Sequence, residues 1–306
     1  MNQEQTNNPL IYRSETVERL CRPLTEPGPV LAGHTGRLPS VERLNHIIRL
    51  VSEVMFPDFF DDQTPSRRVF PSATAVRLDE ISEELSRQIR RAIRLTPPGS
   101  RPSDPGAIAA ETAEEFIRRL PDLRDILLTD VDAMYANDPA ANDRSEVIFC
   151  YPAFKGMMYY RLAHALLEMN VPLLPRIITE SAHSLTGIDI HPGAVIGPYF
   201  SIDHGTGVVI GETCRIGHHV SIYQGVTLGA RNFVLDDSGK PINLPRHPIL
   251  EDYVTVYSNA TILGRITVGH HAVVGGNVWV TRDVPPHARL LQRAPLETKF
   301  DGGLGI

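Results

Sequence analysis

A six-residue rhythm of aliphatic side chains is the feature that most constrains how this chain folds. It recurs, with one interval of eight, at Ile190, Ile196, Ile202, Ile210, Ile216, Ile222 and Leu228. It returns downstream at Val256, Ile262, Val268, Val274 and Val280. An amphipathic helix repeats about every 3.6 residues and a half-buried strand about every two, so neither explains this rhythm. It is typical of the hexapeptide units of a parallel β-helix.

In such a solenoid each unit forms one short strand and one turn of a prism, and its aliphatic anchor packs inward on the preceding coil. Glycines that directly follow an anchor are expected to hold corner conformations that other residues disfavour. These glycines are Gly197, Gly211, Gly217, Gly229, Gly269 and Gly275. Cys214 falls at an inward position and is predicted to be a small core residue.

Length and composition restrict the class of protein. A chain of 306 residues with 42% hydrophobic content predicts two domains with sizeable cores. The net charge of −6, without a basic block, argues against nucleic acid or a membrane as partner. The polar N-terminus and the lack of a long apolar run predict a cytoplasmic location. Three widely separated cysteines favour neither a disulfide framework nor a cysteine zinc site.

The predicted fold class is α+β, with a helical domain followed by a β-helix. Residues 1–39, whose proline and glycine are densest at 23–29, are expected to form a poorly ordered arm. Residues 40–186 form the helical domain, 187–286 the β-helix with an extruded loop at 231–248, and 287–306 a tail. The expected helices cover 40–54, 74–95, 107–120, 123–135, 152–169 and 174–184. Ser40 is predicted as an N-cap, and Pro121 as the break between two helices.

The eight-residue interval displaces Asp203 and His204 from the regular coil, which invites a functional explanation. Histidine is suited to proton transfer near neutral pH. Asp189, fifteen residues earlier, is nearly one coil away, so its carboxylate is a candidate to orient the imidazole. Arg246 and His247, at the end of the loop, are either a carboxylate-binding pair or surface residues. Four other histidines are interpreted as solvated turn residues, namely His218, His219, His270 and His271.

Several of these residues belong to motifs that resemble one known family. The motifs are Asp189-Ile-His-Pro, Asp203-His204-Gly-Thr-Gly, Ile210-Gly-Glu212, Val226-Thr-Leu-Gly229, Arg246-His247-Pro248 and Val284-Pro-Pro. In this order and spacing the sequence is similar to serine O-acetyltransferase, a hexapeptide-repeat enzyme of cysteine synthesis. The resemblance covers about residues 130–286 and includes Asn137-Asp138-Pro139-Ala140. It implies a left-handed β-helix that trimerises, with acetyl-CoA in a groove between subunits; two trimers commonly join through the helical domains.

The resemblance also implies roles for individual residues. His204 would be the general base that takes the proton of the serine hydroxyl, and Asp189 would be its partner. The implied contacts to L-serine are Asp138 and Asp203 for the ammonium group, and Arg246 and His247 for the carboxylate or hydroxyl. The small residues implied to lie against acetyl-CoA are Gly229, Ala230, Ser258 and Gly276. No metal is implied. L-Cysteine is implied as a feedback inhibitor, although Ala230 and the long loop depart from the family pattern.

The tail DGGLGI, ending at Ile306, resembles the family peptide that enters the active site of O-acetylserine sulfhydrylase. The alternative interpretation of this tail is a frayed terminus. Three alternative functions stay open at this point. In the first, the acetyl acceptor is a sugar or an antibiotic, although the charge pair of Asp138 and Arg246 favours an amino acid. In the second, the protein is a metal-dependent hydratase with the same prism, but the His-x-x-x-x-His ligand pair of such enzymes is missing. In the third, the protein is a scaffold that regulates the sulfhydrylase.

Overall fold

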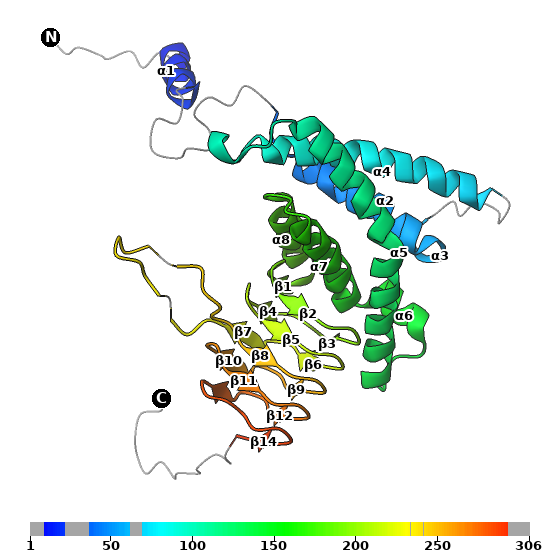
Figure 1. Ribbon diagram of the computed structural model, residues 1–306, viewed down its shortest axis with the longest axis vertical. Coiled ribbons are helices and arrows are strands. Elements are labelled where there is room, and N and C mark those ends of the chain that lie inside the picture. The colour runs from blue at the N-terminus through cyan, green and yellow to red at the C-terminus, as the bar shows by residue number, and fades with distance from the viewer. Residues whose placement is uncertain (1–8, 22–36, 62–68, 233, 241, 293–306) are drawn as a thin grey trace.

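The computed structural model describes residues 9–21, 37–61, 69–232, 234–240 and 242–292, and it has a helical first part followed by a β-helix (Figure 1). The helices are α1 (Pro9–Cys21), α2 (Val41–Met55), α3 (Pro57–Phe60), α4 (Phe70–Ile93), the 3-10 helix η1 (Pro98–Ser100), α5 (Pro105–Asn137), α6 (Arg144–Cys150), α7 (Pro152–Glu168) and α8 (Leu174–Thr186). Ser40 caps α2 as predicted, because its Oγ accepts a hydrogen bond of 3.3 Å from the backbone N–H of Arg43. The predicted order of a helical part and a parallel β-helix is confirmed.

Helices α3, η1 and α6 were not predicted, and α1 and α5 also differ from the prediction. Helix α1 lies within the segment expected to be a poorly ordered arm, because the proline and glycine cluster behind that expectation begins only after Cys21. Pro121 was expected to separate two helices but lies inside α5. Leu120 and Leu127 are 3% and 0% exposed, so core packing on both sides of the proline keeps the chain helical. Figure 1 shows α5 changing direction along its length, as a proline kink requires.

The β-helix consists of three parallel sheets that the chain visits in turn. Sheet A has the order β1-β4-β7-β10-β13, sheet B β2-β5-β8-β11, and sheet C β3-β6-β9-β12-β14. The strands are β1 (Asp189–Ile190), β2 (Val195–Ile196), β3 (Ser201–Asp203), β4 (Val209–Ile210), β5 (Arg215–Ile216), β6 (Ser221–Tyr223), β7 (Thr227–Gly229), β8 (Ile249–Leu250), β9 (Thr255–Val256), β10 (Thr261–Leu263), β11 (Thr267–Val268), β12 (Val273–Val274), β13 (Trp279–Val280) and β14 (Arg289–Leu290). We call the turns from sheet A to B the AB corner, from B to C the BC corner, and from C to A the CA corner.

The strand register confirms the six-residue pattern and its interruption. Asp189 pairs with Val209, twenty residues later, whereas Val209 pairs with Thr227, eighteen residues later. The first coil is therefore two residues longer than the next, and the extra residues lie at the CA corner after β3. The aliphatic anchors stack inward, as Ile210, Leu228 and Ile262 show with at most 1% of their surface exposed. Cys214 is 1% exposed, which confirms its predicted core position.

The predicted role of the glycines after the anchors is wrong. None of these six glycines is among the described residues with positive φ. They are needed because successive coils approach closely: a Cβ at Gly197 would lie 2.7 Å from the carbonyl oxygen of Gly217, and one at Gly269 would lie 2.5 Å from the nitrogen of Pro286. Positive φ angles occur instead at non-glycine corner residues, including Tyr199, His219, Tyr253, His271 and His287 at the BC corner.

A buried ion pair joins the helical part to the β-helix. Asp130 of α5 and Arg161 of α7 make two hydrogen bonds, of 2.6 and 2.9 Å, with side chains that are 0% and 5% exposed. Arg161 also donates to the carbonyl oxygens of Ile196 and Gly197, and Asp130 accepts from the N–H of Phe200. This network fixes the end of α5, and the residues that follow it, against the first coil. Helices α7 and α8 cover the β1 end (Figure 1).

Between β7 and β8 the chain leaves the prism, and the loop projects from the β-helix (Figure 1). Strand β8 then rejoins sheet B beside β5, which restores the six-residue register. Of the helices in the described ranges, none has both the length and the apolar character to cross a membrane.

Candidate active site

The first cluster of predicted site residues lies at the CA corner and consists of Asp138, Asp203 and His204. His204 has φ 57° and its side chain is 72% exposed, so the turn directs its imidazole into solvent. Its Nε2 lies 3.7 Å from Oδ1 of Asp203. The next residue, Gly205, has φ 88°, and a Cβ there would lie 2.6 Å from Cδ1 of Ile188. The two-residue insertion thus places a histidine and a carboxylate on an exposed, tightly built turn.

Asp138 brings a second carboxylate from the helical part to this corner. It follows α5 directly, and Asn137 holds the end of the helix on sheet C by donating to Ser201 Oγ and Ser221 Oγ, at 2.8 Å each. Its Oδ1 accepts from the N–H of Ala140, and its Oδ2 accepts from the hydroxyl of Tyr151. The bond from Tyr151, with the N–H of Ala140 and the nearby His204, lowers the pKa of Asp138. The carboxylate is therefore anionic beside the histidine.

Tyr151 is a site residue that the sequence analysis did not identify. Partial burial, followed by the hydrogen bond to Asp138, raises the pKa of its hydroxyl, so it stays a donor at neutral pH. It lies between α6 and α7, thirteen residues after Asp138, and no spacing rule links the two positions. Only the tertiary structure brings the hydroxyl to Asp138.

The predicted partner of His204, Asp189, begins β1 just beyond the CA corner. Its backbone N–H donates to Val208, and its side chain is half-buried. In the part of the chain that the structure describes, the carboxylate with an oxygen within 4 Å of a His204 ring nitrogen is that of Asp203. The pairing of Asp189 with His204 therefore stays a prediction.

The second cluster lies at the AB corner and consists of Glu212, Arg246 and His247. Arg246 donates to Oε2 of Glu212 at 2.6 Å and to Oδ1 of Asn243 at 2.9 Å. Partial burial is the largest single influence on Glu212 and raises its pKa. The hydrogen bond from Arg246, the charges of His191 and Arg246 and the bond from Asn243 together outweigh burial and leave this pKa below its ordinary value. The guanidinium is held by these two bonds, and within the described residues no further hydrogen bond is seen from its other N–H groups.

His247 is buried and neutral. Its exposed fraction is 7%, and burial, together with the charge of Arg246, lowers its pKa to about 4. Its Nδ1 accepts from the N–H of Thr213 at 3.1 Å and lies 2.9 Å from the Thr213 hydroxyl. This assigns the proton to Nε2, which can donate a hydrogen bond to a substrate. Thr213 also accepts from the N–H groups of Arg246 and His247, so it organises the turn.

The four small residues expected to line an acetyl-CoA groove divide between the two corners. Gly229 and Ala230 lie where β7 runs into the AB corner, and the N–H of Gly264 donates to the Gly229 oxygen. Ser258 and Gly276 lie on successive coils at the CA corner, where a Cβ at Gly276 would be 3.1 Å from the Ser258 oxygen. The structure therefore brings together the members of each pair and keeps the two pairs on different corners.

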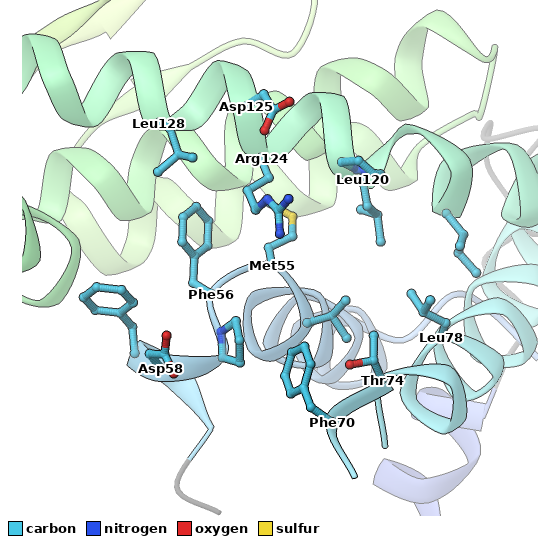
Figure 2. Close-up of a pocket in the computed structure, with 15 residues that line it drawn as sticks. Met55, Phe56, Asp58, Phe70, Thr74, Leu78, Leu120, Arg124, Asp125 and Leu128 are labelled. Carbon is cyan, nitrogen blue, oxygen red and sulfur yellow. The ribbon is translucent and has the colours of Figure 1, made fainter. Parts of the chain in front are cut away.

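Among the cavities in the described part of the structure, one lies away from both clusters and another adjoins the second cluster. One, of about 550 Å³, lies between α2, α3, α4 and α5, and its wall is mainly apolar, with Phe56, Phe70 and Leu78 among the side chains in Figure 2. None of its described lining residues is a predicted site residue. The other, of about 340 Å³, lies under the extruded loop and includes Arg246 and Arg265. Arg265 donates to the carbonyl oxygens of Thr213 and His247 and so supports the second cluster.

Comparison with known proteins identifies this arrangement. The helical part followed by hexapeptide coils, with histidine, carboxylates and arginine at the corners, defines a β-helix protein whose corners carry groups suited to proton transfer and to binding charged ligands. No family model matches the chain. It is 44% identical over 298 residues to the plasmid-encoded serine acetyltransferase of Synechococcus elongatus, covering 95% of this chain and 93% of that protein. The chain belongs to the serine acetyltransferase family.

Solved structures agree. Serine acetyltransferase 1 of Entamoeba histolytica, in complex with L-cysteine, matches with a TM-score of 0.70 and 36% identity, over 83% of this chain and 87% of that one. A serine acetyltransferase in complex with CoA matches with a TM-score of 0.53 and 26% identity, over 83% of this chain and 97% of that one. The resemblance stated from the sequence motifs is thereby confirmed, and acetyl-CoA is the co-substrate of the enzyme.

Proposed function

We propose that the chain transfers the acetyl group of acetyl-CoA to the hydroxyl of L-serine at a site shared by neighbouring chains of a trimer. The observation that carries this proposal is the position of the two clusters. They lie at the two corners that flank sheet A, so side chains that point outward from one corner do not face the other. The ammonium and carboxylate groups of serine share one carbon atom, so both clusters must converge on one small molecule. A second copy placed against sheet A allows this convergence.

In this proposal, Asp138 and Asp203 bind the serine ammonium group. Both carboxylates lie beside His204, and the lowered pKa of Asp138 keeps its charge available. Arg246 of the neighbouring chain binds the serine carboxylate with donors not used by Glu212 and Asn243. The neutral His247 contributes its Nε2–H to the same end of the substrate. These contacts favour an amino acid over a neutral sugar, since each charge of the substrate is matched.

The reaction follows from the exposed imidazole of His204. Its unprotonated nitrogen takes the proton of the serine hydroxyl as the oxygen attacks the thioester carbonyl. The tetrahedral intermediate collapses, the carbon–sulfur bond breaks, and the imidazolium returns the proton to the CoA sulfur. Serine becomes O-acetylserine, and the base returns to its starting state. Asp189 would orient the ring for this transfer.

Acetyl-CoA is proposed to lie along the coils between the pair Gly229 and Ala230 of one chain and the pair Ser258 and Gly276 of the next. Small side chains allow a pantetheine arm to approach backbone amides.

L-Cysteine, found in the Entamoeba relative, is proposed to compete with serine here, because it carries the same ammonium and carboxylate groups. Joining of two trimers through the helical parts is a further proposal. A cytoplasmic location is also proposed, since the exposed Cys150 is a free thiol.

The proposed partner enzyme, O-acetylserine sulfhydrylase, would bind the C-terminal residue Ile306, which lies outside the described residues. A glycine-rich segment that ends in one apolar side chain suits insertion into a pocket. Calorimetric titration of the sulfhydrylase with the full chain and with a chain that lacks Ile306 tests this proposal. We expect binding to be lost, and equal affinity of the two chains would refute it.

The test of the catalytic proposal is release of free CoA from acetyl-CoA in the presence of L-serine. We expect His204→Ala to lower serine-dependent release by about 10²- to 10⁴-fold, the usual contribution of a general base. His218→Ala is the matched control, because that histidine is also partly exposed but lies at the BC corner. L-Homoserine as acceptor tests the fit of the serine pocket. A His204→Ala enzyme that retains wild-type turnover would contradict the assignment of the base.

A further inference from the structure

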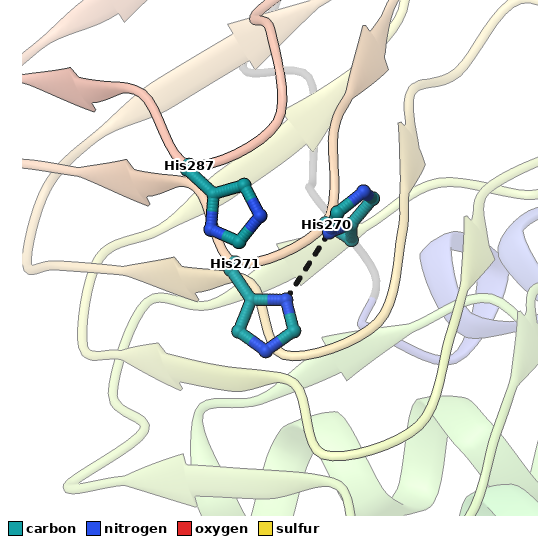
Figure 3. A group of neighbouring side chains, drawn as sticks. All are labelled: His270, His271 and His287. Carbon is teal, nitrogen blue, oxygen red and sulfur yellow. Dashed lines mark hydrogen bonds between the residues drawn. The ribbon is translucent and has the colours of Figure 1, made fainter.

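Three histidines cluster at the BC corner of the last two coils, away from the first and second clusters of predicted site residues. His270 and His271 form the turn between β11 and β12, and His287 lies one coil further along, before β14. Each contributes a ring nitrogen to a group in which all three nitrogens lie within 4.8 Å of one another. Figure 3 shows the three rings gathered on one side of the turn. All three residues are exposed.

The ring geometry is close to that of a metal site. Nδ1 of His270 lies 3.2 Å from Nδ1 of His271. Two imidazole nitrogens bound to one tetrahedral zinc ion at about 2.1 Å lie about 3.4 Å apart, so this pair is already at the required separation. The centroid of the His287 ring lies 4.9 Å from that of His270 and 5.0 Å from that of His271. Because the His287 side chain is exposed, it can rotate to bring its ring nitrogen, which lies within 4.8 Å of the other two, to the same ion.

The backbone holds the three histidines in place. His271 and His287 have φ angles of 59° and 60°, and the N–H of His287 donates to the carbonyl oxygen of His270 at 2.9 Å. The N–H of His270 donates to Oε2 of Glu251 at 2.8 Å. A positive φ is a general feature of the BC corner, because Tyr199, His219 and Tyr253 also have one. The grouping of three imidazoles, in contrast, is found among the described residues in the last two coils. The cluster is therefore mounted on a rigid turn.

The position of the cluster separates it from acetyl transfer. Predicted catalytic and substrate residues lie at the AB and CA corners, on either side of sheet A, and the BC corner is the edge of the prism opposite that sheet. Chains that meet along sheet A leave this edge at the outside of the assembly. A ligand at the three histidines would therefore reach its site in the trimer and would not touch serine or acetyl-CoA.

We propose that His270, His271 and His287 bind one divalent transition-metal ion per chain, with water in the remaining position. Three imidazoles suit Zn²⁺, Cu²⁺ or Ni²⁺, whereas Mg²⁺ and Ca²⁺ prefer oxygen ligands. The ion ties the final coil, which carries His287, to the coil before it. Terminal repeats of a solenoid have a neighbour on one side only, so a link at this place holds the exposed end of the β-helix.

Zinc titration of the full-length protein, stripped with a chelator, tests the site. By calorimetry with Zn²⁺ we expect one ion per chain, and His271→Asn or His287→Asn weakens binding at least tenfold. Asparagine is chosen because it tolerates positive φ better than alanine does. His219→Asn is the matched control, since His219 has the same φ region at the same corner but lies outside the cluster. No saturable binding at millimolar Zn²⁺, or equal affinity in the His270/His271/His287 triple variant, would overturn the proposal.

Two further measurements distinguish the parts of this proposal. Electron paramagnetic resonance with Cu²⁺ reports nitrogen ligands directly, and we expect fewer coupled nitrogens in His287→Asn than in the wild-type chain. Hydrogen exchange of residues 285–290 should slow on addition of Zn²⁺ in the wild type but not in that variant. Zinc binding without slower exchange would refute the link between coils. Acetyl transfer by each variant, unchanged from wild type, shows that the protein is folded.

Discussion

Gly211 and His247 are fitted to each other at the AB corner. A Cβ at Gly211 would lie 2.0 Å from Cδ2 and 2.2 Å from Nε2 of His247, well inside contact distance. We expect Gly211→Ala to displace the imidazole and to lower kcat/KM for serine by about 10- to 100-fold, because misplacement of a substrate-binding group by about 1 Å has effects of that size. Steady-state kinetics with varied serine measure this loss.

Gly156→Ala is the control for that substitution, because its Cβ would meet Ile188 at an ordinary 3.5 Å. Wild-type kinetics in Gly211→Ala would show that His247 does not contact the substrate.

His247 also predicts a dependence of stability on pH. Its pKa is about 4 in the folded chain, chiefly because of burial, and about 6.5 when unfolded. As the pH falls between these values the unfolded state takes up the proton and the folded state does not, so the free energy of unfolding decreases. The decrease approaches about 1.4 kcal/mol per pH unit within that range and is absent above it.

Urea unfolding at about pH 7 and about pH 5 measures this effect. His247→Gln should show a smaller decrease than the wild type, but not a flat profile, because burial also lowers the pKa of His191. His183→Gln, an exposed position on α8, should leave the decrease unchanged. An equal decrease in the wild type and His247→Gln would contradict the buried neutral histidine.

At the scale of elements, the junction between α5, α7 and the first coil depends on Asp130 and Arg161. Replacement of Arg161 by methionine leaves a buried carboxylate without its partner, and loss of one member of such a pair costs about 3 to 5 kcal/mol. We expect a large fall in the thermal midpoint of Arg161→Met. A lower affinity for serine should accompany it, because α5 carries Asp138 to the CA corner.

The matched control for the junction is Arg118→Met on α5, the helix that carries Asp130. Arg118 pairs with Glu115, but its side chain is 61% exposed, so we expect a change of at most about 0.5 kcal/mol. If the two substitutions have similar effects on the thermal midpoint, the buried pair does not hold the junction.

At the scale of the whole molecule, a site shared between chains predicts complementation. His204→Ala and Arg246→Ala are each expected to be inactive, because each removes one half of every site. In trimers assembled from an equal mixture, about a quarter of the sites combine an intact His204 with an intact Arg246 from the neighbour. Co-refolded mixtures should therefore recover about that fraction of wild-type activity. No recovery in trimers shown by mass spectrometry to be mixed would place both halves in one chain.

The sequence alone determined the architecture of this protein. A six-residue period is compatible with few folds, since each aliphatic anchor must stack on the one before it. The sequence therefore predicted the β-helix and its longer first coil correctly. The family also followed from local motifs. These features are local in the chain, because each depends on residues within one or two coils.

Only the tertiary structure decided the features that depend on distant contacts. Pro121 stays helical because of core packing, the glycines after the anchors are required by the adjacent coil, and Tyr151 meets Asp138 through the fold of α6 and α7. The distribution of the two clusters of predicted site residues between separate corners is likewise a property of the closed prism. Spacing along a chain states how far apart two residues are, but it does not state which side chains the packed coils and helices bring into contact.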